Sequence, residues 1–383
     1  MIDLLAWALL LLPAAVTLVL LAELIAAFWP ARRPSAGTVS HIVVIVPAHD
    51  EEAGIAATVA GIRASAPDAR LIVIADNCGD ATAPAARAAG AEVITRRDPD
   101  RHGKGFALAF ARDRLAADPP DVVVIIDADC SVESDGIARL AATAQTSGGP
   151  VQSAYLMRPR PDLGTMVGLS GFAFLVRNLV RQRGLARLGA PALLTGSGMA
   201  FRWDIFAAAP LATAELTEDL AIGIALSRSG LPPVFLPDVT TWSDPARRSA
   251  TRIQRTRWEQ GFLRTTIAQT PSLLASGRCS LTWLGLHLLV PPLAVLVLID
   301  GAALALLGLL ANSGATTLPF CLLLGLLPPL LLLLGLTWLR FGRAQISAVQ
   351  LLLIPFYIAW KLPIYVGALF RPERLWIRTD RLP

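Results

Sequence analysis

Charged residues are scarce in this chain of 383 residues, at 16%, whereas hydrophobic residues make up 54% and the mean hydropathy is +0.56. This balance excludes a disordered chain and is too apolar for an ordinary soluble protein. Lysine occurs only as Lys104 and Lys361, so arginine carries nearly all of the positive charge behind the net +5. Such a charge suits a nucleic-acid binder or a protein at an anionic membrane, and the apolar runs described below favour the membrane and no nucleic acid.

Several sequence patterns of common binding sites are missing. The four cysteines form no C-x-x-C pair and no ligand spacing with the four histidines, which argues against a zinc site or a disulfide framework. The glycine pattern of dinucleotide-binding folds and the P-loop pattern are also absent. The nucleotide-binding classes that depend on these two patterns therefore lose their main support.

The apolar residues are concentrated at the two ends of the chain, in the runs Leu4–Phe28, Leu281–Leu310, Leu318–Leu339 and Ile346–Phe370. The first run is too long for a signal peptide and has no basic residues before it, so we expect a retained anchor. The last run contains Pro355, Lys361 and Pro363. We therefore expect it to lie in the interface or to re-enter the membrane, with a full span as the alternative.

Arginines beside the apolar runs predict the orientation in the membrane. Arg32 and Arg33 place the middle of the chain in the cytoplasm, and Arg340 and Arg343 place the loop after the third run there as well. A last run that does not cross would keep the basic tail 371–383 on the same side. The expectation is a multi-pass protein of the inner (plasma) membrane whose middle domain lies in the cytoplasm.

The domain boundaries follow from these runs: a transmembrane helix at 1–30, a soluble domain at 39–245, an amphipathic interfacial segment at 246–277, membrane helices at 281–370 and the tail at 371–383. Within the soluble domain, strand and helix patterns alternate along the chain. This order predicts an α/β fold with a mostly parallel sheet.

Acidic residues follow three of the predicted strands at 41–47, 71–75 and 121–126. Asp50, Asp76 and the pair Asp127 and Asp129 come after these strands. A lone aspartate after a strand is usually a turn or cap residue. Three in successive units meet at one sheet edge, where their repulsion favours a divalent cation with a phosphate-bearing ligand.

The order of motifs resembles that of membrane-bound family 2 glycosyltransferases, which include cellulose, chitin and hyaluronan synthases. The motifs are Val46-Pro47-Ala48-His49-Asp50-Glu51-Glu52, Ala75-Asp76-Asn77-Cys78-Gly79-Asp80, Gly103-Lys104-Gly105, Asp127-Ala128-Asp129, Thr217-Glu218-Asp219 and Gln254-Arg255-Thr256-Arg257-Trp258. The resemblance implies a GT-A-type nucleotide-sugar-binding domain and covers about Val43 to Phe262.

The resemblance also implies a role for each matching residue. It assigns the donor pocket to Pro47, Asp50, Asp76, Lys104, Asp127 and Arg257, and the acceptor side to Gly196, Ser197, Glu218, Gln254 and Trp258. In this scheme Asp76 accepts from the N3–H of uracil, which favours a UDP-sugar. Asp129 holds Mg²⁺ or Mn²⁺ on the diphosphate, and Asp219 is the general base that deprotonates the acceptor hydroxyl.

Four readings compete at this point. The leading one is an inverting transferase that adds sugar to a lipid-linked or nascent glycan acceptor in contact with membrane lipids. The chain lacks the Phe-x-Val-Thr-x-Lys gating loop of cellulose-type enzymes, which weakens a processive polysaccharide synthase. A nucleotidyltransferase needs a basic phosphate-gripping loop where this chain has Asp50 and Glu51, and a non-catalytic membrane subunit would have lost Asp129 or Asp219.

Overall fold

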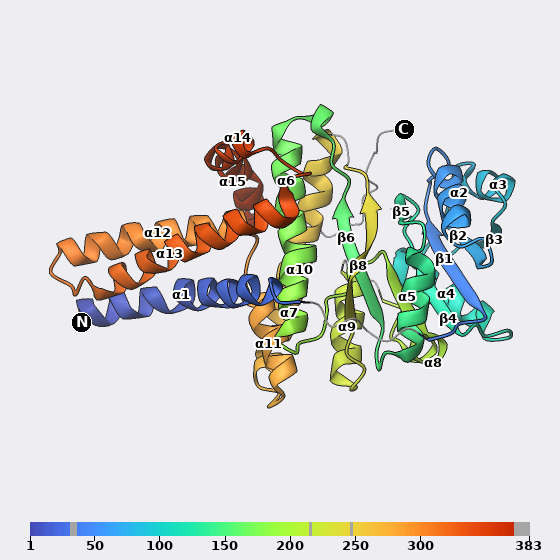
Figure 1. The fold of residues 1–383 in the computed structure, drawn as a ribbon, viewed down its shortest axis with the longest axis horizontal. Coiled ribbons are helices and arrows are strands. Elements are labelled where there is room, and N and C mark those ends of the chain that lie inside the picture. The colour runs from blue at the N-terminus through green and yellow to red at the C-terminus, as the bar shows by residue number, and fades with distance from the viewer. Residues whose placement is uncertain (31–36, 214–216, 246–247, 371–383) are drawn as a thin grey trace. The chain divides into compact units, whose positions relative to one another are not determined.

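A computed structural model describes residues 1–30, 37–213, 217–245 and 248–370, except for the side chains of 248–260 and 363–370 (Figure 1). The chain packs as two compact units. Of the described residues, unit 1 is formed by 1–30, 159–190 and 266–370, and unit 2 by 37–158, 191–213, 217–245 and 248–265. The segment 159–190 thus leaves the predicted soluble domain and packs with the apolar helices.

The first half of unit 2 alternates strands and helices, as the sequence predicts. Its elements are β1 (Ile42–Ala48), α2 (Ile55–Ser65), β2 (Arg70–Asp76), α3 (Thr82–Ala88), β3 (Glu92–Arg96), α4 (Lys104–Leu115) and β4 (Val122–Ile125). The four strands pair in parallel, so their carboxyl ends share one sheet edge. Nearly every residue of β1 and all of β4 are buried, because helices cover both faces of the sheet.

The second half of unit 2 turns the sheet into a mixed one. It contains β5 (Cys130–Val132), α5 (Gly136–Thr146), β6 (Val151–Met157), β7 (Met199–Arg202), α8 (Trp203–Ala208), α9 (Glu218–Arg228), β8 (Val234–Ser243) and the first part of α10 (Arg248–Leu274). From Thr266 onward, α10 belongs to unit 1. The strand order is β3-β2-β1-β4-β7-β6-β8-β5. Strand β7 runs antiparallel to both β4 and β6, and β5 runs antiparallel to β8. The prediction of a mostly parallel sheet is therefore wrong, because it extended the β-α-β order of the first four strands to the whole sheet.

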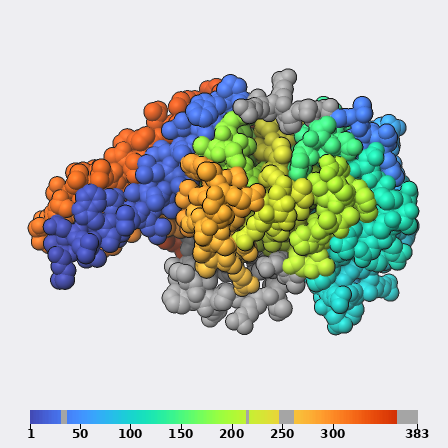
Figure 2. All heavy atoms as spheres, turned by 90° about the horizontal axis from the view of Figure 1, so that it is seen from below, coloured from blue at the N-terminus to red at the C-terminus, as the bar shows by residue number. Residues whose placement is uncertain are grey.

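Unit 1 is helical. It contains α1 (Ile2–Ala27), η1 (Pro161–Leu163), α6 (Thr165–Leu175), the π-helices η2 (Val176–Arg181) and η3 (Trp338–Gly342), α7 (Gln182–Arg187), α11 (Cys279–Leu289), α12 (Leu293–Asn312), α13 (Leu318–Thr337), α14 (Ala348–Leu351) and α15 (Ile354–Phe370). Helix α1 lies against the α12–α13 hairpin along its length (Figures 1 and 2). Among the described residues, three helical stretches are long and apolar enough to cross a membrane, namely Ile2–Ala27, Leu293–Asn312 and Leu318–Gly342.

Two of the apolar runs are broken in the structure. The run 281–310 divides into α11 and α12 at Val290–Pro292, where Pro291 and Pro292 cannot continue a helix. The run 346–370 divides into α14 and α15 just before Pro355. Of the run 281–310, α12 is the part that is long and apolar enough to cross a membrane.

A buried ionic cluster ties together three separate segments of unit 1. Nε of Arg181 in η2 donates to Oε2 of Glu23 in α1 at 2.6 Å, and His287 Nδ1 in α11 lies 2.6 Å from Glu23 Oε1. All three residues are buried. Closer to the start of α1, the hydroxyl of Thr17 donates to Oδ2 of Asp300 in α12 at 3.0 Å. These contacts reduce the cost of placing polar groups among apolar helices.

Candidate active site

The loops that follow β1 and β2 are bound to each other by hydrogen bonds. Asp50, after β1, has a positive φ of 53°, and its Oδ1 accepts a 2.7 Å hydrogen bond from the amide of Gly79. Oε2 of Glu52 accepts a 2.8 Å hydrogen bond from the amide of Ala81 in the loop after β2. A positive φ on a non-glycine residue costs of order 1 to 3 kcal/mol. The contacts between the loops offset that cost and fix Asp50 at the sheet edge.

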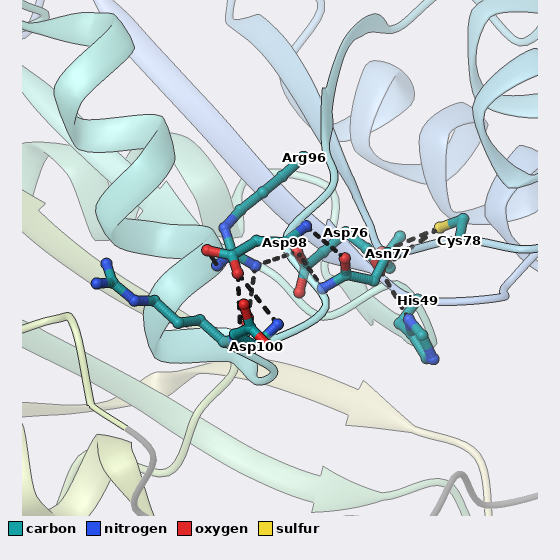
Figure 3. A network of polar contacts seen from close by, with 9 residues as sticks. His49, Asp76, Asn77, Cys78, Arg96, Asp98 and Asp100 are labelled. Carbon is teal, nitrogen blue, oxygen red and sulfur yellow. Dashed lines mark hydrogen bonds and ion pairs between the residues drawn. The ribbon is translucent and has the colours of Figure 1, made fainter.

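The carboxylate of Asp76 is held by a buried arginine at the end of β3 (Figure 3). Arg96 pairs with Asp76 in the β2–β3 register, and its Nη1 donates to Asp76 Oδ1 at 2.6 Å. The guanidinium also donates to Asp98 Oδ2 at 2.9 Å and to the carbonyl oxygen of Arg101 at 2.8 Å. Oδ1 of Asn77, whose φ is 52°, accepts from the amide of Asp98 at 2.8 Å. The network therefore links the ends of two strands to the loop before α4.

This network leaves one oxygen of Asp76 for a ligand. Within the described part of the chain, its side-chain hydrogen bonds, from Arg96 and from Asn77 Nδ2, end on Oδ1. Oδ2 is thus available to a donor such as the N–H of a nucleobase. The motif-based reasoning missed Arg96 and Asp98. Their position at the end of the third strand could have identified them, because the register places Arg96 opposite Asp76.

Three predicted site residues converge around a fourth, Gly196. Lys104 begins α4, and its ammonium forms an ion pair with Asp127 and donates a 2.6 Å hydrogen bond to the carbonyl oxygen of Gly196. Gly196 has a φ of 89°, and a Cβ placed on it would lie 3.3 Å from Asp219 Oδ2, 3.4 Å from Lys104 Nζ and 3.8 Å from Asp127 Oδ2. A side chain at this position would therefore crowd the three charged groups. The glycine lets them approach one another.

The charges in this cluster shift the acid–base behaviour of its members. Burial and the neighbouring carboxylate of Asp219 raise the pKa of Glu218 to about 8. Burial alone would lower the pKa of Lys104, but the carboxylates of Asp127 and Glu218 outweigh it and raise that pKa above its usual value. At neutral pH the cluster therefore contains a protonated Glu218 and a charged Lys104. Acid–base groups with separated pKa values are typical of catalytic sites.

Two buried side chains hold the backbone beside this cluster. The Oγ of Ser197 accepts a 3.0 Å hydrogen bond from the amide of Asp127. Gln152 in β6 donates through Nε2 to the carbonyl oxygen of Ser197 at 2.9 Å and accepts through Oε1 from the amide of Thr195 at 2.9 Å. Ser197 and Gln152 are fully buried. Sequence reasoning missed Gln152, a polar residue inside a strand that was not predicted.

The first turn of α9 positions the predicted base. Asp219 lies in this turn, and its Oδ1 accepts from the amide of Leu220 at 2.8 Å. Thr217 occupies the N-cap position but makes no capping bond, and its hydroxyl lies 2.9 Å from the hydroxyl of Thr265 in α10. The hydroxyl of Thr217 therefore ties α9 to α10 and does not cap α9.

Asp127 and Asp129 suit a hard cation. Oxygens of the two carboxylates and the sulfur of Cys130 lie within 4.8 Å of one another. Burial and the charge of Asp127 raise the pKa of Cys130 to about 12, so its sulfur stays protonated. The remaining ligands are carboxylate oxygens, which Mg²⁺ and Mn²⁺ prefer. Zinc and copper sites rarely consist of carboxylate oxygens alone. A metal held there would neutralise charge on a diphosphate.

The other predicted residues are only partly accessible to description. Pro47 lies in β1 and is partly buried. Helix α10 contains Gln254, Arg257 and Trp258, whose side chains lie outside the described part of the structure. Their predicted contacts with the diphosphate and the acceptor remain predictions.

Comparison with known proteins agrees with this geometry. Residues 40–261 match the family described as "Glycosyltransferase like family 2". The mannosyltransferase PcManGT from Pyrobaculum calidifontis, solved in complex with GDP-Man and Mn²⁺, has a TM-score of 0.61 at 16% identity, over 97% of this chain and 100% of that chain. At this identity the likeness establishes a GT-A-like fold and no more.

A curated relative gives a shorter match. The low-salt glycan biosynthesis hexosyltransferase Agl6 of Haloferax volcanii is 32% identical over 100 residues, which is 25% of this chain and 23% of the relative. The match thus spans less than a quarter of that protein. The family match, in contrast, covers more than half of the chain, including Asp76, Asp127 and Asp219. The chain therefore belongs to glycosyltransferase family 2.

Proposed function

We propose that this protein is a membrane-anchored, metal-dependent, inverting glycosyltransferase that moves a sugar from a UDP-sugar to a lipid-linked or nascent glycan acceptor at the cytoplasmic membrane face. The observation that carries the proposal is the meeting of Lys104, Asp127 and Asp219 around Gly196. Such a cluster provides a cation for a phosphate-bearing donor and a carboxylate for an acceptor hydroxyl.

The donor side rests on two groups of side chains. Asp76, oriented by Arg96, offers Oδ2 to an N–H of the base. Asp127 and Asp129 offer oxygens to Mg²⁺ or Mn²⁺, which supplies positive charge to the diphosphate when bound. PcManGT, whose fold is similar, was solved with a GDP-sugar, so both nucleotides belong in the test.

The acceptor side rests on Asp219 and Glu218. Direct displacement at the sugar needs one base to take the proton of the attacking hydroxyl, and it inverts the anomeric configuration. Asp219 faces the same point as the Lys104–Asp127 pair. The protonated Glu218 beside it can donate a hydrogen bond to an acceptor oxygen without adding a negative charge.

The apolar helices of unit 1 support a membrane location. Three of them are long enough to span, and their exposed leucines need an apolar surrounding. An acceptor with a lipid anchor would be concentrated at the surface of the same membrane. The few polar groups inside these helices give little lining for a long polysaccharide channel, so we propose the addition of one or a few sugars.

Mass spectrometry of reaction products tests the proposal. Purified full-length protein is incubated with a panel of UDP- and GDP-sugars, membrane lipid extract and Mn²⁺, with Asp204→Asn as the matched control variant. Asp204 is an exposed carboxylate of α8 that pairs with Arg202, so its loss should leave transfer unchanged.

The expected product is a lipid-extractable glycan that carries one or a few additional sugars from a UDP-sugar, in amounts that vanish with EDTA. Transfer from GDP-sugars alone would show that the donor is a GDP-sugar and that the proposed UDP-sugar is wrong. A high-molecular-weight polymer would favour the processive synthase. No transfer from any nucleotide sugar, or full activity in EDTA, would contradict the proposed reaction.

A further inference from the structure

Three arginines meet three aromatic rings within unit 1, at the end of the third candidate span. This arginine–aromatic cluster consists of Phe28, Arg183, Trp338, Arg340, Phe341 and Arg343. The guanidinium of Arg340 lies 5.8 Å from the ring centre of Phe28 and 5.4 Å from that of Phe341. Arg183 approaches the Phe341 ring as well, at 5.4 Å. Two like charges thus share one ring.

The cluster joins segments that are distant in sequence. Arg183 of α7 donates through Nε to the carbonyl oxygen of Ala27, the last residue of α1, at 3.3 Å. The indole of Trp338 in η3 donates to the carbonyl oxygen of Ile346 at 2.9 Å, and Arg343 lies 6.0 Å from the same ring. The backbone and a ring thus hold Arg183, whereas rings alone restrain Arg340 and Arg343. This restraint lowers the side-chain entropy that is lost on binding a ligand.

Two of the arginines in this cluster, Arg340 and Arg343, form no ion pair with a described residue of unit 1. The described part of unit 1 contains four carboxylates, Asp3, Glu23, Asp162 and Asp300. Asp3 binds the amide of Thr316, and Glu23 binds Arg181 and His287. Asp162 pairs with Arg160, and Asp300 accepts from the hydroxyl of Thr17. Neither Arg340 nor Arg343 is among these partners. Both side chains are exposed, so they can pair with an external anion.

The geometry suits a phosphate. A guanidinium that lies over a ring keeps the N–H groups of its edge free to point outward. Such edges bind phosphate oxygens with two parallel hydrogen bonds. An aromatic stack also holds the guanidinium in place, so that the fork is ready before the anion arrives.

The neighbouring surface indicates that the phosphate carries acyl chains. Leu336 and Leu339, within one turn of Arg340, are exposed large apolar side chains, and the apolar stretch that ends in η3 is 25 residues long. Basic and aromatic residues that follow such a stretch are typical of the headgroup region. A soluble phosphate compound would gain nothing from the adjoining leucines.

We infer that the arginine–aromatic cluster is a binding site for the headgroup of an anionic phospholipid, with its acyl chains lying along the outer face of α13. The inference rests on the proposed membrane location of unit 1 and adds a specific lipid site to it. It involves no residue of the proposed donor or acceptor site, all of which lie in unit 2.

Native mass spectrometry of the full-length protein in detergent tests this site, with dioleoylphosphatidylglycerol and dioleoylphosphatidylcholine as probes. The variant is Arg340→Gln/Arg343→Gln. The matched control is Arg87→Gln/Arg114→Gln in unit 2, which removes the same charge from exposed arginines, one of them 4.9 Å from the ring centre of Phe110. UDP binding is measured on the same preparations.

The wild type and the control should prefer phosphatidylglycerol. The cluster variant should bind this lipid about tenfold more weakly than the wild type, since each basic residue near a membrane surface contributes a several-fold preference. UDP binding should be unchanged. Equal affinity of the wild type for both lipids, or an equal loss in the control, would overturn the inference. Failure of UDP binding in the wild type would count against the proposed function alone.

Two further measurements cover the remaining outcomes. Excess inorganic phosphate should leave the lipid bound, and displacement by it would show a site for free phosphate instead. If the glutamine variant does not fold, the wild type still decides: its preference for phosphatidylglycerol should fall with rising salt. A preference that salt does not change would contradict an arginine–phosphate site.

Discussion

Replacement of Arg96 by glutamine tests whether the network around Asp76 positions the donor pocket. Arg96 and Asp76 are each 7% exposed, and their 2.6 Å ion pair is joined by a 2.9 Å bond to Asp98. The glutamine side chain is too short to reach all of these partners. Arg96→Gln therefore leaves the carboxylate of Asp76 buried without its cation.

The cost follows from the burial. Removing one partner of a buried ion pair destabilises a protein by about 3 to 5 kcal/mol, because the other charge stays behind uncompensated. An exposed pair contributes at most about 1 kcal/mol. The Arg70–Glu92 pair lies across the same two strands, with side chains that are 36% and 44% exposed. Arg70→Gln is thus a matched control that should cost several kcal/mol less than Arg96→Gln.

Urea unfolding of the full-length protein, followed by tryptophan fluorescence, measures the difference, and calorimetry with UDP measures the pocket. Arg96→Gln should lower the unfolding midpoint and weaken UDP binding, whereas Arg70→Gln should change both only slightly. The double variant Asp76→Asn/Arg96→Gln should recover part of the stability because no buried charge is left, but not the UDP affinity. Equal midpoints for the two single arginine variants would refute the reasoning.

Three other substitutions give separate tests. The pKa of Glu218 rises from 4.5 to about 8 on folding, so the native protein binds an extra proton and its stability should fall as the pH rises from 4.5 to 8. Glu218→Gln should abolish this pH dependence of the melting temperature, measured with EDTA present. An unchanged pH dependence in the variant would contradict the prediction. Glu23→Gln should lower the free energy of unfolding by about 3 to 5 kcal/mol, because it leaves Arg181 buried and unpaired. Asp3→Asn, at the exposed end of α1, is the control and should have little effect. Similar melting temperatures for the two variants would be evidence against the buried cluster. Asp129→Asn should weaken UDP binding only when Mn²⁺ or Mg²⁺ is present, and an equal loss without metal would exclude a role through the cation.

Elements with strong local patterns could be predicted from the sequence. The uninterrupted β-branched runs of β1 and β4 indicate strands covered on both faces, and the acidic residues after them follow from the turn chemistry. The resemblance to family 2 glycosyltransferases implies that Lys104 and Asp127 lie in one pocket, and the two form an ion pair in the structure.

Features set by tertiary pairing could not be predicted in this way. Strand β6 contains Gln152 and Ser153, so its sequence lacks the apolar run of a buried strand, and its polar side chains are satisfied by partners in distant segments. The antiparallel strand β7 has only four residues. Without these strands the mixed sheet could not be recognised.

Buried ion pairs show the same limit. Hydropathy marks Glu23 as the one acid in an apolar run, but its partners Arg181 and His287 lie 158 and 264 residues away in the chain. Arg96 is 20 residues from Asp76, and only the strand register brings the two together. Long-range partners of this kind require the fold to be known first.

The central claim is that Asp219 is the base of a glycosyl transfer, and single-turnover transfer by Asp219→Asn measures it most directly. Asparagine keeps the shape of the side chain but cannot accept the proton, so the rate of sugar transfer should fall by about 10² or more. UDP binding measured by calorimetry should stay within a few-fold of the wild type, because the donor contacts lie on other residues. Transfer at the wild-type rate by Asp219→Asn would contradict the account.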